Sequence, residues 1–327
     1  MEQSRAGDAR DRPDTPKMPV PGKIGGRGVY ASEVKLVPIL AMFVFLTVAV
    51  ILGYHTGSHP AQAKAAPFTV ADTPASQERN VDVKTTTPPT EKYPTLTSDM
   101  NAAIAASPSV SAAATLIDLD TGTAYNAGNY TQNYEAASTA KLVAVFDYLH
   151  QVELGKTALT KTIQGDTAQD LIQRMIVNSD NDAWTKLNMY LTMKQEQAYA
   201  NSLGLTGTVL QVNNIQFTTA SMAKLLQLLY QGKLLSPQNQ ALVYGYMAHT
   251  TMNKLIPAAL PVDATIYHKY GQIDGVLHDA AIVQYQGHNF VLVVYTDNPA
   301  GTSGQSGTQT NLIHAVTSAA LTDITGN

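Results

Sequence analysis

The sequence predicts a domain of the mixed α/β (α+β) class, in which one mixed sheet is interrupted by an all-helical insertion, with a membrane-spanning helix before it. Three observations predict this organisation. β-type segments stand at both ends of the globular part, apolar residues recur at helical spacing between them, and an uncharged apolar run precedes them. A chain of 327 residues, 44% of them hydrophobic, is long enough to bury the core of one or two domains.

A hairpin and a helix open the globular part. Residues 112–118 and 123–130 surround the turn-forming triplet Asp120-Thr121-Gly122, which predicts a β-hairpin. Residues 141–152 have apolar side chains close to a 3.6-residue period, which predicts a helix.

The middle of the chain, about residues 157–262, is predicted to be helical. Thr218 or Thr219 is suited to cap the last of its helices, because threonine oxygens accept hydrogen bonds from the first free backbone N–H groups. The predicted helices cover residues 171–177, 182–190 and 219–230.

β-type composition returns near the C-terminus. Gly287 separates the last two of three predicted strands and indicates a hairpin turn between them. The strands are expected over residues 265–272, 280–286 and 290–296, and a final helix over about residues 307–321.

Composition and charge exclude several classes of function. The chain has no cysteine, so it has no disulfide, no Cys-ligated metal and no Cys nucleophile. Residues 96–327 hold 16 of the 25 acidic side chains but only 10 of the 21 basic ones, and Arg174 is the only arginine after Arg79. A nucleic-acid partner is therefore not expected, because such proteins bind phosphates with basic surfaces.

Residues 36–54 are predicted to anchor the protein in a membrane. The first 18 of them carry no charge and would span roughly 27 Å as a helix, close to the thickness of the bilayer core. More basic residues lie before this run than after it. By the positive-inside rule this places residues 1–35 in the cytoplasm and the residues after the run outside. The alternative is a cleaved signal peptide, because Ala61-Gln62-Ala63 has the form of a processing site. With either a membrane anchor or a signal peptide, the globular domain is expected to lie outside the cytoplasm.

A Pro/Thr-rich linker is expected over residues 55–95, because prolines and a threonine run replace apolar periodicity there. The globular domain is expected to cover residues 96–327, with about residues 157–262 as its helical subdomain.

Three short motifs bring together residues suited to acyl transfer. Ser138 and Lys141 are three residues apart at a predicted helix start, so a hydroxyl and an amine project from one face. Ser179-Asp180-Asn181 precedes another helix, which Ser179 or Asp180 is also suited to cap. Lys269-Tyr270-Gly271 lies in a predicted strand, after His268. Each motif alone is weak evidence for function.

In this order and on these elements, the motifs resemble those of the serine β-lactamase and penicillin-binding protein superfamily, especially its class A β-lactamase-like branch. The resemblance covers about residues 96–327 and extends to YEAASTAKL, FTTASMAKLLQLLYQGKLLS and HDAAIV. It implies a β-lactamase-like antiparallel sheet flanked by helices, and a serine acyl-hydrolase that needs no metal and no cofactor.

The resemblance also implies roles for individual residues. Ser138 would be the nucleophile and Lys141 its base, with a pKa lowered by burial or by the charge of Lys269. Ser179 would carry a proton to the leaving nitrogen. The remaining implied groups bind substrate: Asn181, Tyr270, Gly271 and Gln272, with the backbone N–H groups of Ser138 and Gln272 forming the oxyanion hole.

Three departures from the family pattern limit this inference. No Asp or Glu lies between Gln197 and Val262, where class A enzymes carry the glutamate that activates the deacylating water. Tyr270 replaces the small Ser or Thr of the K-[ST]-G motif. No arginine is available to bind a substrate carboxylate beyond Arg174.

Two functions therefore remain open from the sequence. One is an exported serine acyl-hydrolase that acts on β-lactams or on D-Ala-D-Ala-type stem peptides of peptidoglycan, with slow deacylation. The other is a non-catalytic wall-binding or scaffolding domain that retains the fold, favoured by Tyr270 and by the missing glutamate. If deacylation is fast, Glu135 or Asp166 would have to supply the base.

Overall fold

The computed structural model describes residues 91–299 and 307–326. A five-stranded sheet in the order β2-β1-β10-β9-β8 forms its centre, and every neighbouring pair of strands is antiparallel. The strands are β1 (Ser111–Asp118), β2 (Ala124–Gly128), β8 (Thr265–Ile273), β9 (Val276–Tyr285) and β10 (His288–Asp297). The expected hairpins, the C-terminal strands and the antiparallel sheet that the resemblance implied are thus confirmed. The sheet has no parallel pair of strands, so the expectation that it is mixed is wrong.

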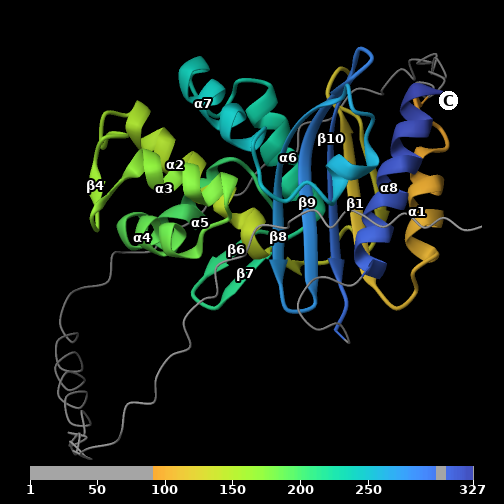
Figure 1. Cartoon of the computed structure of the whole chain (residues 1–327), viewed down its shortest axis with the longest axis horizontal. Helices are drawn as coiled ribbons and strands as arrows, with labels where there is room; N and C mark the ends of the chain where they lie inside the picture. Colours follow the sequence, from red (N-terminus) through yellow and green to blue (C-terminus); the bar gives the residue numbers. More distant parts are fainter. Residues whose placement is uncertain (1–90, 300–306, 327) are drawn as a thin grey trace, which may run out of the picture. The chain divides into compact units, whose positions relative to one another are not determined.

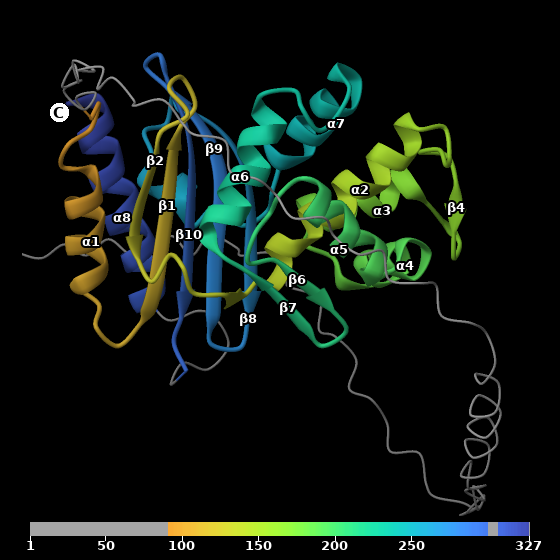
Figure 2. The same cartoon turned by 180° about the vertical axis from the view of Figure 1, so that it is seen from behind.

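Helices cover both faces of this sheet. On one face, α1 (Leu96–Ala105) and α8 (Gly307–Thr325) run side by side, although they come from opposite ends of the domain (Figure 1). On the other face, α6 (Thr219–Tyr230) packs against β1, β9 and β10 (Figure 2). The central strands are therefore buried on both sides, which explains why β9 and β10 are buried along most of their length and why residues 290–295 of β10 are all apolar or aromatic.

The helical region lies at the β8 edge of the sheet (Figure 1). Its helices are α2 (Lys141–Glu153), α3 (Ala168–Val177), α4 (Asn181–Leu191), α5 (Met193–Ser202) and α7 (Pro237–Met247). Four are capped by side chains at their N-termini: Thr167 accepts from Asp170 N, Asp180 from Asp182 N and Ala183 N, Thr192 from Gln195 N, and Ser236 from Asn239 N. Thr218 caps α6, as the sequence suggested.

The insertion over residues 157–262 is not all-helical, which corrects the sequence prediction. It contains one hairpin of β4 (Thr162–Ile163) with β5 (Asp166–Thr167), and another of β6 (Val209–Gln211) with β7 (Asn214–Phe217). β7 also pairs with β3 (Tyr134–Glu135), just before Ser138. Strands of two to four residues are too short to produce an alternating sequence pattern, and here their turns are formed by backbone in the left-handed region, at Gln164, Gly165 and Asn213.

Two hydrophobic cores lie on the two faces of the sheet. One joins α2, α3 and α6 to side chains such as Val291 and Val293, and the other joins α1 and α8 to the alternate residues Leu292 and Val294. Successive residues of one strand therefore belong to different cores. The helices on both faces therefore pack on the same sheet.

The predicted membrane segment, residues 36–54, lies outside the described residues, as do the tail and most of the linker. Within residues 91–299 and 307–326, no helix combines the length and apolar character needed to cross a bilayer.

Candidate active site

Ser138 stands on a short 3-10 helix, η1 (Ala137–Ala140), which continues into α2. The spacing of three residues brings Nζ of Lys141 to 2.9 Å from Oγ of Ser138, as the sequence predicted. Ala137, directly before the serine, has a φ of 45°, a conformation that non-glycine residues rarely adopt. Strain of this kind persists only where the surroundings hold the backbone in place.

Lys141 is buried, with 1% of its surface exposed, although lysine is usually at the surface. Its Nζ also donates to the backbone oxygen of Ser179 at 2.6 Å and to Oδ1 of Asn181 at 2.6 Å. Burial lowers the pKa of Lys141 to about 8, against the opposing effect of the Asp180 carboxylate. A substantial fraction of Lys141 is therefore neutral near physiological pH and able to accept a proton.

The loop Ser179-Asp180-Asn181 is held from two sides. Asp180 caps α4 and accepts a hydrogen bond from Nε of Arg174 at 2.8 Å. Ser179 has a φ of 57°, which presents its side chain toward Lys269. Asp180 is thus the cap that the sequence suggested, and Arg174 supports the loop.

Lys269 reaches the site from β8. Its Nζ donates to Oγ of Ser179 at 2.9 Å and to the backbone oxygen of Tyr270 at 2.8 Å, and it lies 4.1 Å from the centre of the Tyr270 ring. Burial, and then the charge of Lys141, hold the pKa of Lys269 well below its usual value. Of the two causes that the sequence left open for a lowered pKa of Lys141, burial is the one that acts.

Gly271 allows β8 to approach the nucleophile. A Cβ at this position would lie 3.0 Å from the oxygen of Ala136, 3.1 Å from Cβ of Ala137 and 3.1 Å from N of Ser138. Gly271 is buried and lines neither of the two pockets at Ser138 described below, so its contribution is close packing. Asn181 and Gln272 line both pockets, and Tyr270 lines one.

Beneath the nucleophile lies a buried network to which the sequence assigned no role. His278 accepts from the backbone N–H of Thr296 at Nδ1, so its Nε2 carries the proton and donates to the backbone oxygen of Glu135 at 2.8 Å. Its ring stacks on Tyr295, whose hydroxyl lies 2.7 Å from Oγ1 of Thr139. Burial lowers the pKa of His278 to about 4, so it is neutral. The network fixes the backbone on both sides of Ser138.

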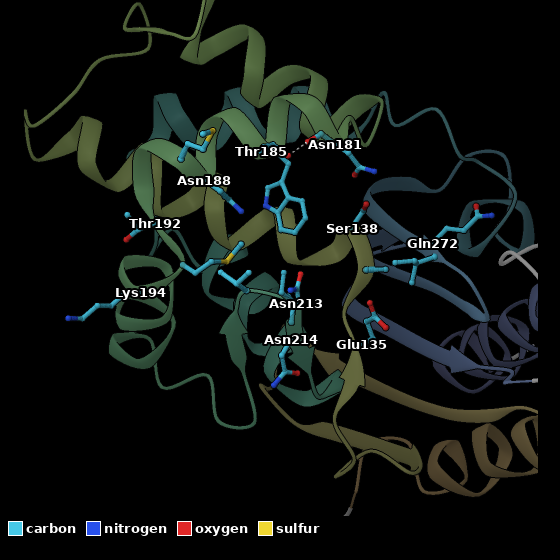
Figure 3. Close-up of a pocket in the computed structure, with 17 residues that line it drawn as sticks. Glu135, Ser138, Asn181, Thr185, Asn188, Thr192, Lys194, Asn213, Asn214 and Gln272 are labelled. Carbon is cyan, nitrogen blue, oxygen red and sulfur yellow. Dashed lines mark hydrogen bonds between the residues drawn. The ribbon is translucent and has the colours of Figure 1, made fainter. Parts of the chain in front are cut away.

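Two pockets meet at Ser138. The larger, about 1190 Å³, extends toward α4, α5 and the β6–β7 hairpin, with apolar walls from Trp184, Met193 and Val212. Figure 3 shows Ser138 between Gln272 on one side and the wall formed by Asn188 and Thr192 on the other. The smaller, about 330 Å³, is bounded by Ser179, Tyr270 and Asp274. Tyr270 therefore borders the cleft at Ser138 without filling it.

The two candidate bases for a deacylating water are placed differently. Glu135 is the only acidic residue among the described residues that line the larger pocket. Asp166 lines neither pocket and is engaged by Lys186 at 2.7 Å and by Arg174 at 3.3 Å. Asp166 is therefore held by two cations and does not line either pocket at Ser138. Within the described ranges, no group of three or more His, Asp or Glu side chains could hold a metal ion.

In this site a serine lies beside a buried, partly neutral lysine, and a second serine and lysine lie within hydrogen-bond distance of each other. This is the arrangement of a serine acyl-hydrolase. A family model described as the beta-lactamase enzyme family matches residues 95–324. The chain belongs to this family of serine hydrolases.

Solved structures with the same fold include PBP-A, with a TM-score of 0.66, 22% sequence identity, and coverage of 72% of this chain and 97% of that chain. A mutant of PBP-A, described as an acyl-enzyme complex with penicillin G, has a TM-score of 0.65 at 23% identity and covers 71% of this chain and 97% of that one. A β-lactamase from Sphaerobacter thermophilus has a TM-score of 0.64 at 21% identity, over 70% of this chain and 97% of that chain. No curated protein sequence matches the chain.

Proposed function

We propose that this protein forms an acyl-enzyme on Ser138 with β-lactams or with D-Ala-D-Ala-type amides of peptidoglycan stem peptides. The observation that carries the proposal is the 2.9 Å distance between Oγ of Ser138 and Nζ of Lys141, together with the pKa of about 8 that burial gives this lysine. The description of a PBP-A mutant as a penicillin G acyl-enzyme supports the choice of probe. A non-catalytic scaffold has no need of a buried base aimed at a serine.

The proposed acylation balances within the site. Neutral Lys141 takes the proton of Ser138, and the serine oxygen bonds to the carbonyl carbon. As the carbon–nitrogen bond breaks, Ser179 gives its hydroxyl proton to the leaving nitrogen and takes one from Lys269, whose Nζ donates to Oγ of Ser179. The proton that Lys141 gains and the one that Lys269 loses cancel, so the total charge of the two lysines is unchanged. The proton removed from Ser138 is thereby matched by the one gained by the amine. The N–H groups of Ser138 and Gln272 would stabilise the oxyanion.

Intact mass measurement tests this proposal. Wild-type chain incubated with penicillin G should gain the mass of one penicillin, and Ser138→Ala should gain none. Ser109→Ala removes an exposed serine far along the chain from the motifs and serves as the matched control. Equal labelling of wild type and Ser138→Ala would refute the assignment.

Slow deacylation is a second part of the proposal. It is supported by the β6–β7 region, which has no carboxylate, and by the engagement of Asp166 with Lys186. The penicillin adduct should therefore persist after free penicillin is removed. Glu135→Gln should leave the lifetime of the adduct unchanged. A large increase in lifetime would identify Glu135 as the missing base, and rapid turnover by wild type would reject slow deacylation.

We further propose that residues 36–54 anchor the protein in the membrane, with the N-terminus in the cytoplasm and the acyl-hydrolase domain outside. The charge difference across the uncharged run supports this orientation. Protease added to intact cells should degrade the domain and spare a tag at Met1. Protection of the domain would reject the topology, and a mature N-terminus at Lys64 would identify a signal peptide instead.

A further inference from the structure

Trp184 lies between the proposed base and the larger of the two pockets at Ser138. It follows Asn181 by three residues on α4, so both side chains project from the same face of the helix. Oδ1 of Asn181 accepts a hydrogen bond from Nζ of Lys141, and the centre of the Trp184 ring lies 5.5 Å from the same Nζ. Trp184 also lines the larger pocket, whereas Lys141 lines neither pocket. The indole is therefore an apolar part of the wall that separates Lys141 from the pocket.

The space on the other side of this wall is open to water. Met189 and Val212 line the larger pocket and are 67% and 77% exposed. Lys141, directly behind the wall, has only 1% of its surface exposed. Water stabilises the charged form of an amine, so a lysine beside a hydrated pocket stays partly neutral only where an apolar group excludes water from it. Trp184 is placed to be that group.

An aromatic ring beside a lysine has two opposite effects on its charge. The face of the ring attracts a cation and favours the protonated form, whereas the exclusion of water favours the neutral form. Nζ of Lys141 has three oxygen acceptors, on Ser138, Ser179 and Asn181, which match its three possible N–H donors. Its N–H groups are thus directed at oxygens and not at the ring, so we expect the exclusion of water to be the larger effect.

The charged groups on the elements packed around Lys141 remain in place when Trp184 is replaced. The Asp180 carboxylate raises the pKa of Lys141, and the charge of Lys141 lowers the pKa of Lys269. The charged groups of this region are Asp180 before α4, Lys269 on β8, Arg174 on α3, which donates to Asp180, and Glu196 on α5, which interacts with Asp147.

We propose that Trp184 is a positioning residue that shields Lys141 from the water of the larger pocket and so keeps it able to accept the proton of Ser138. The inference rests on the proposed acylation of Ser138. Nε1 of Trp184 is buried without a hydrogen-bond partner among the described residues. The ring is therefore held by packing, and another aromatic ring can replace it without the loss of a hydrogen bond.

The pH at which Ser138 acylation reaches half its maximal rate tests the proposal, with penicillin G, the full-length chain and intact mass measurement. Trp184→Ala admits water to Lys141 and should raise this midpoint by about one pH unit. Trp184→Leu keeps part of the apolar volume and should raise it by about half a unit, which keeps the test available if the alanine variant does not fold. Trp184→Phe retains a ring and should restore the wild-type midpoint.

Tyr190→Ala is the matched control, because it removes another aromatic side chain of α4 that lines neither pocket. Its midpoint should equal that of the wild type. A midpoint that falls in Trp184→Ala or Trp184→Leu would show that the attraction of the ring for the cation is the larger effect, and would overturn the inference. An unchanged midpoint in both variants would overturn it as well.

A second measurement needs no substrate, because Trp184 is the only tryptophan of the chain. A charge that appears 5.5 Å from the ring centre changes the electric field at the indole and hence its fluorescence. The emission of the wild type should therefore change with pH around the pKa of Lys141, about 8, and that of Lys141→Met should not. An emission that does not follow Lys141 would overturn the inference. If the emission follows Lys141 but penicillin G does not label Ser138, the proposed function fails while the contact of Trp184 with the lysine stands.

Discussion

Asp279 on β9 and Glu196 on α5 are both buried carboxylates, with 0% and 1% of their surfaces exposed, but their surroundings differ. Asp279 accepts from Ile256 N at 3.1 Å and lies 2.9 Å from Nδ1 of His268. Neither carboxylate oxygen of Glu196 has a hydrogen-bond partner among the described residues. Burial, and then the charge of Asp147, raise the pKa of Glu196 to about 8.

A related contrast is found near Ser138. His278 on β9 has a defined partner for each ring nitrogen, is neutral, and fixes the backbone around Ser138. Lys141 on α2 and Lys269 on β8 also have hydrogen-bond partners, but burial lowers the pKa of both. The histidine therefore provides fixed geometry, and the two lysines provide groups whose charge depends on pH.

The largest expected effect distinguishes the two lysines. Lys141→Ala should slow Ser138 acylation by about a thousandfold, because it removes the base. Lys269→Ala should slow it by about a hundredfold, because Ser179 loses its partner while the base remains. The rates are measured with penicillin G by intact mass. Equal losses, or a larger loss for Lys269→Ala, would move the role of base to Lys269.

The next effect concerns stability. The folded-state pKa of Glu196, about 8, exceeds its ordinary value of 4.5, so the folded state holds an extra proton between these values. Stability from this group is therefore lost as pH rises through this window. Relative to wild type, Glu196→Gln should gain about 3 kcal/mol of unfolding free energy from pH 5 to pH 9.

Urea unfolding at several pH values measures this gain. Glu91→Gln removes an exposed carboxylate at the edge of the domain and is the control, for which the difference from wild type should stay constant with pH. A pH-independent difference for Glu196→Gln would show that Glu196 is charged in the folded protein.

A smaller effect tests how closely β8 must approach Ser138. Gly271→Ala places a Cβ within 3.0–3.1 Å of the backbone on either side of the nucleophile, so acylation should fall about tenfold. Gly245→Ala, on an exposed position of α7 with no atom within 4 Å, is the control and should add about 0.5 kcal/mol of stability. If the Gly271→Ala variant is acylated at the wild-type rate, close packing of β8 against residues 136–138 does not set the position of Ser138.

The smallest expected effect is a shift in pH dependence. Acylation should rise with pH and level off above about 8, because Lys141 must be neutral to act as a base. Asp180 raises the pKa of Lys141, so Asp180→Asn should move this midpoint to lower pH by a fraction of a unit. Asp182→Asn, which also removes a partner of Arg174, should not. A midpoint that moves to higher pH would contradict the assignment.

Most elements of the central sheet could be predicted from the sequence, because their strands are long and their turns contain Gly122 and Gly287. Helices α2, α3, α4, α6 and α8 were also predicted, from their apolar composition and, for α2, α4 and α6, from a capping or motif residue at the start. Helix α5 is mostly polar and follows Thr192, whose φ of 71° no sequence pattern indicates. The β6–β7 hairpin was missed because its strands have three and four residues.

The sequence by itself determined the partnership of Ser138 and Lys141, because a spacing of three residues on one helix is a local property of the chain. It also determined, by resemblance, which loop and strand would meet them. Only the tertiary structure decided that Lys141 is partly neutral, that Asp166 is engaged by Lys186 and Arg174, and that Tyr270 borders the cleft at Ser138 without filling it. Burial and charge at these positions arise from segments far apart in the chain, and no local pattern specifies how such segments pack.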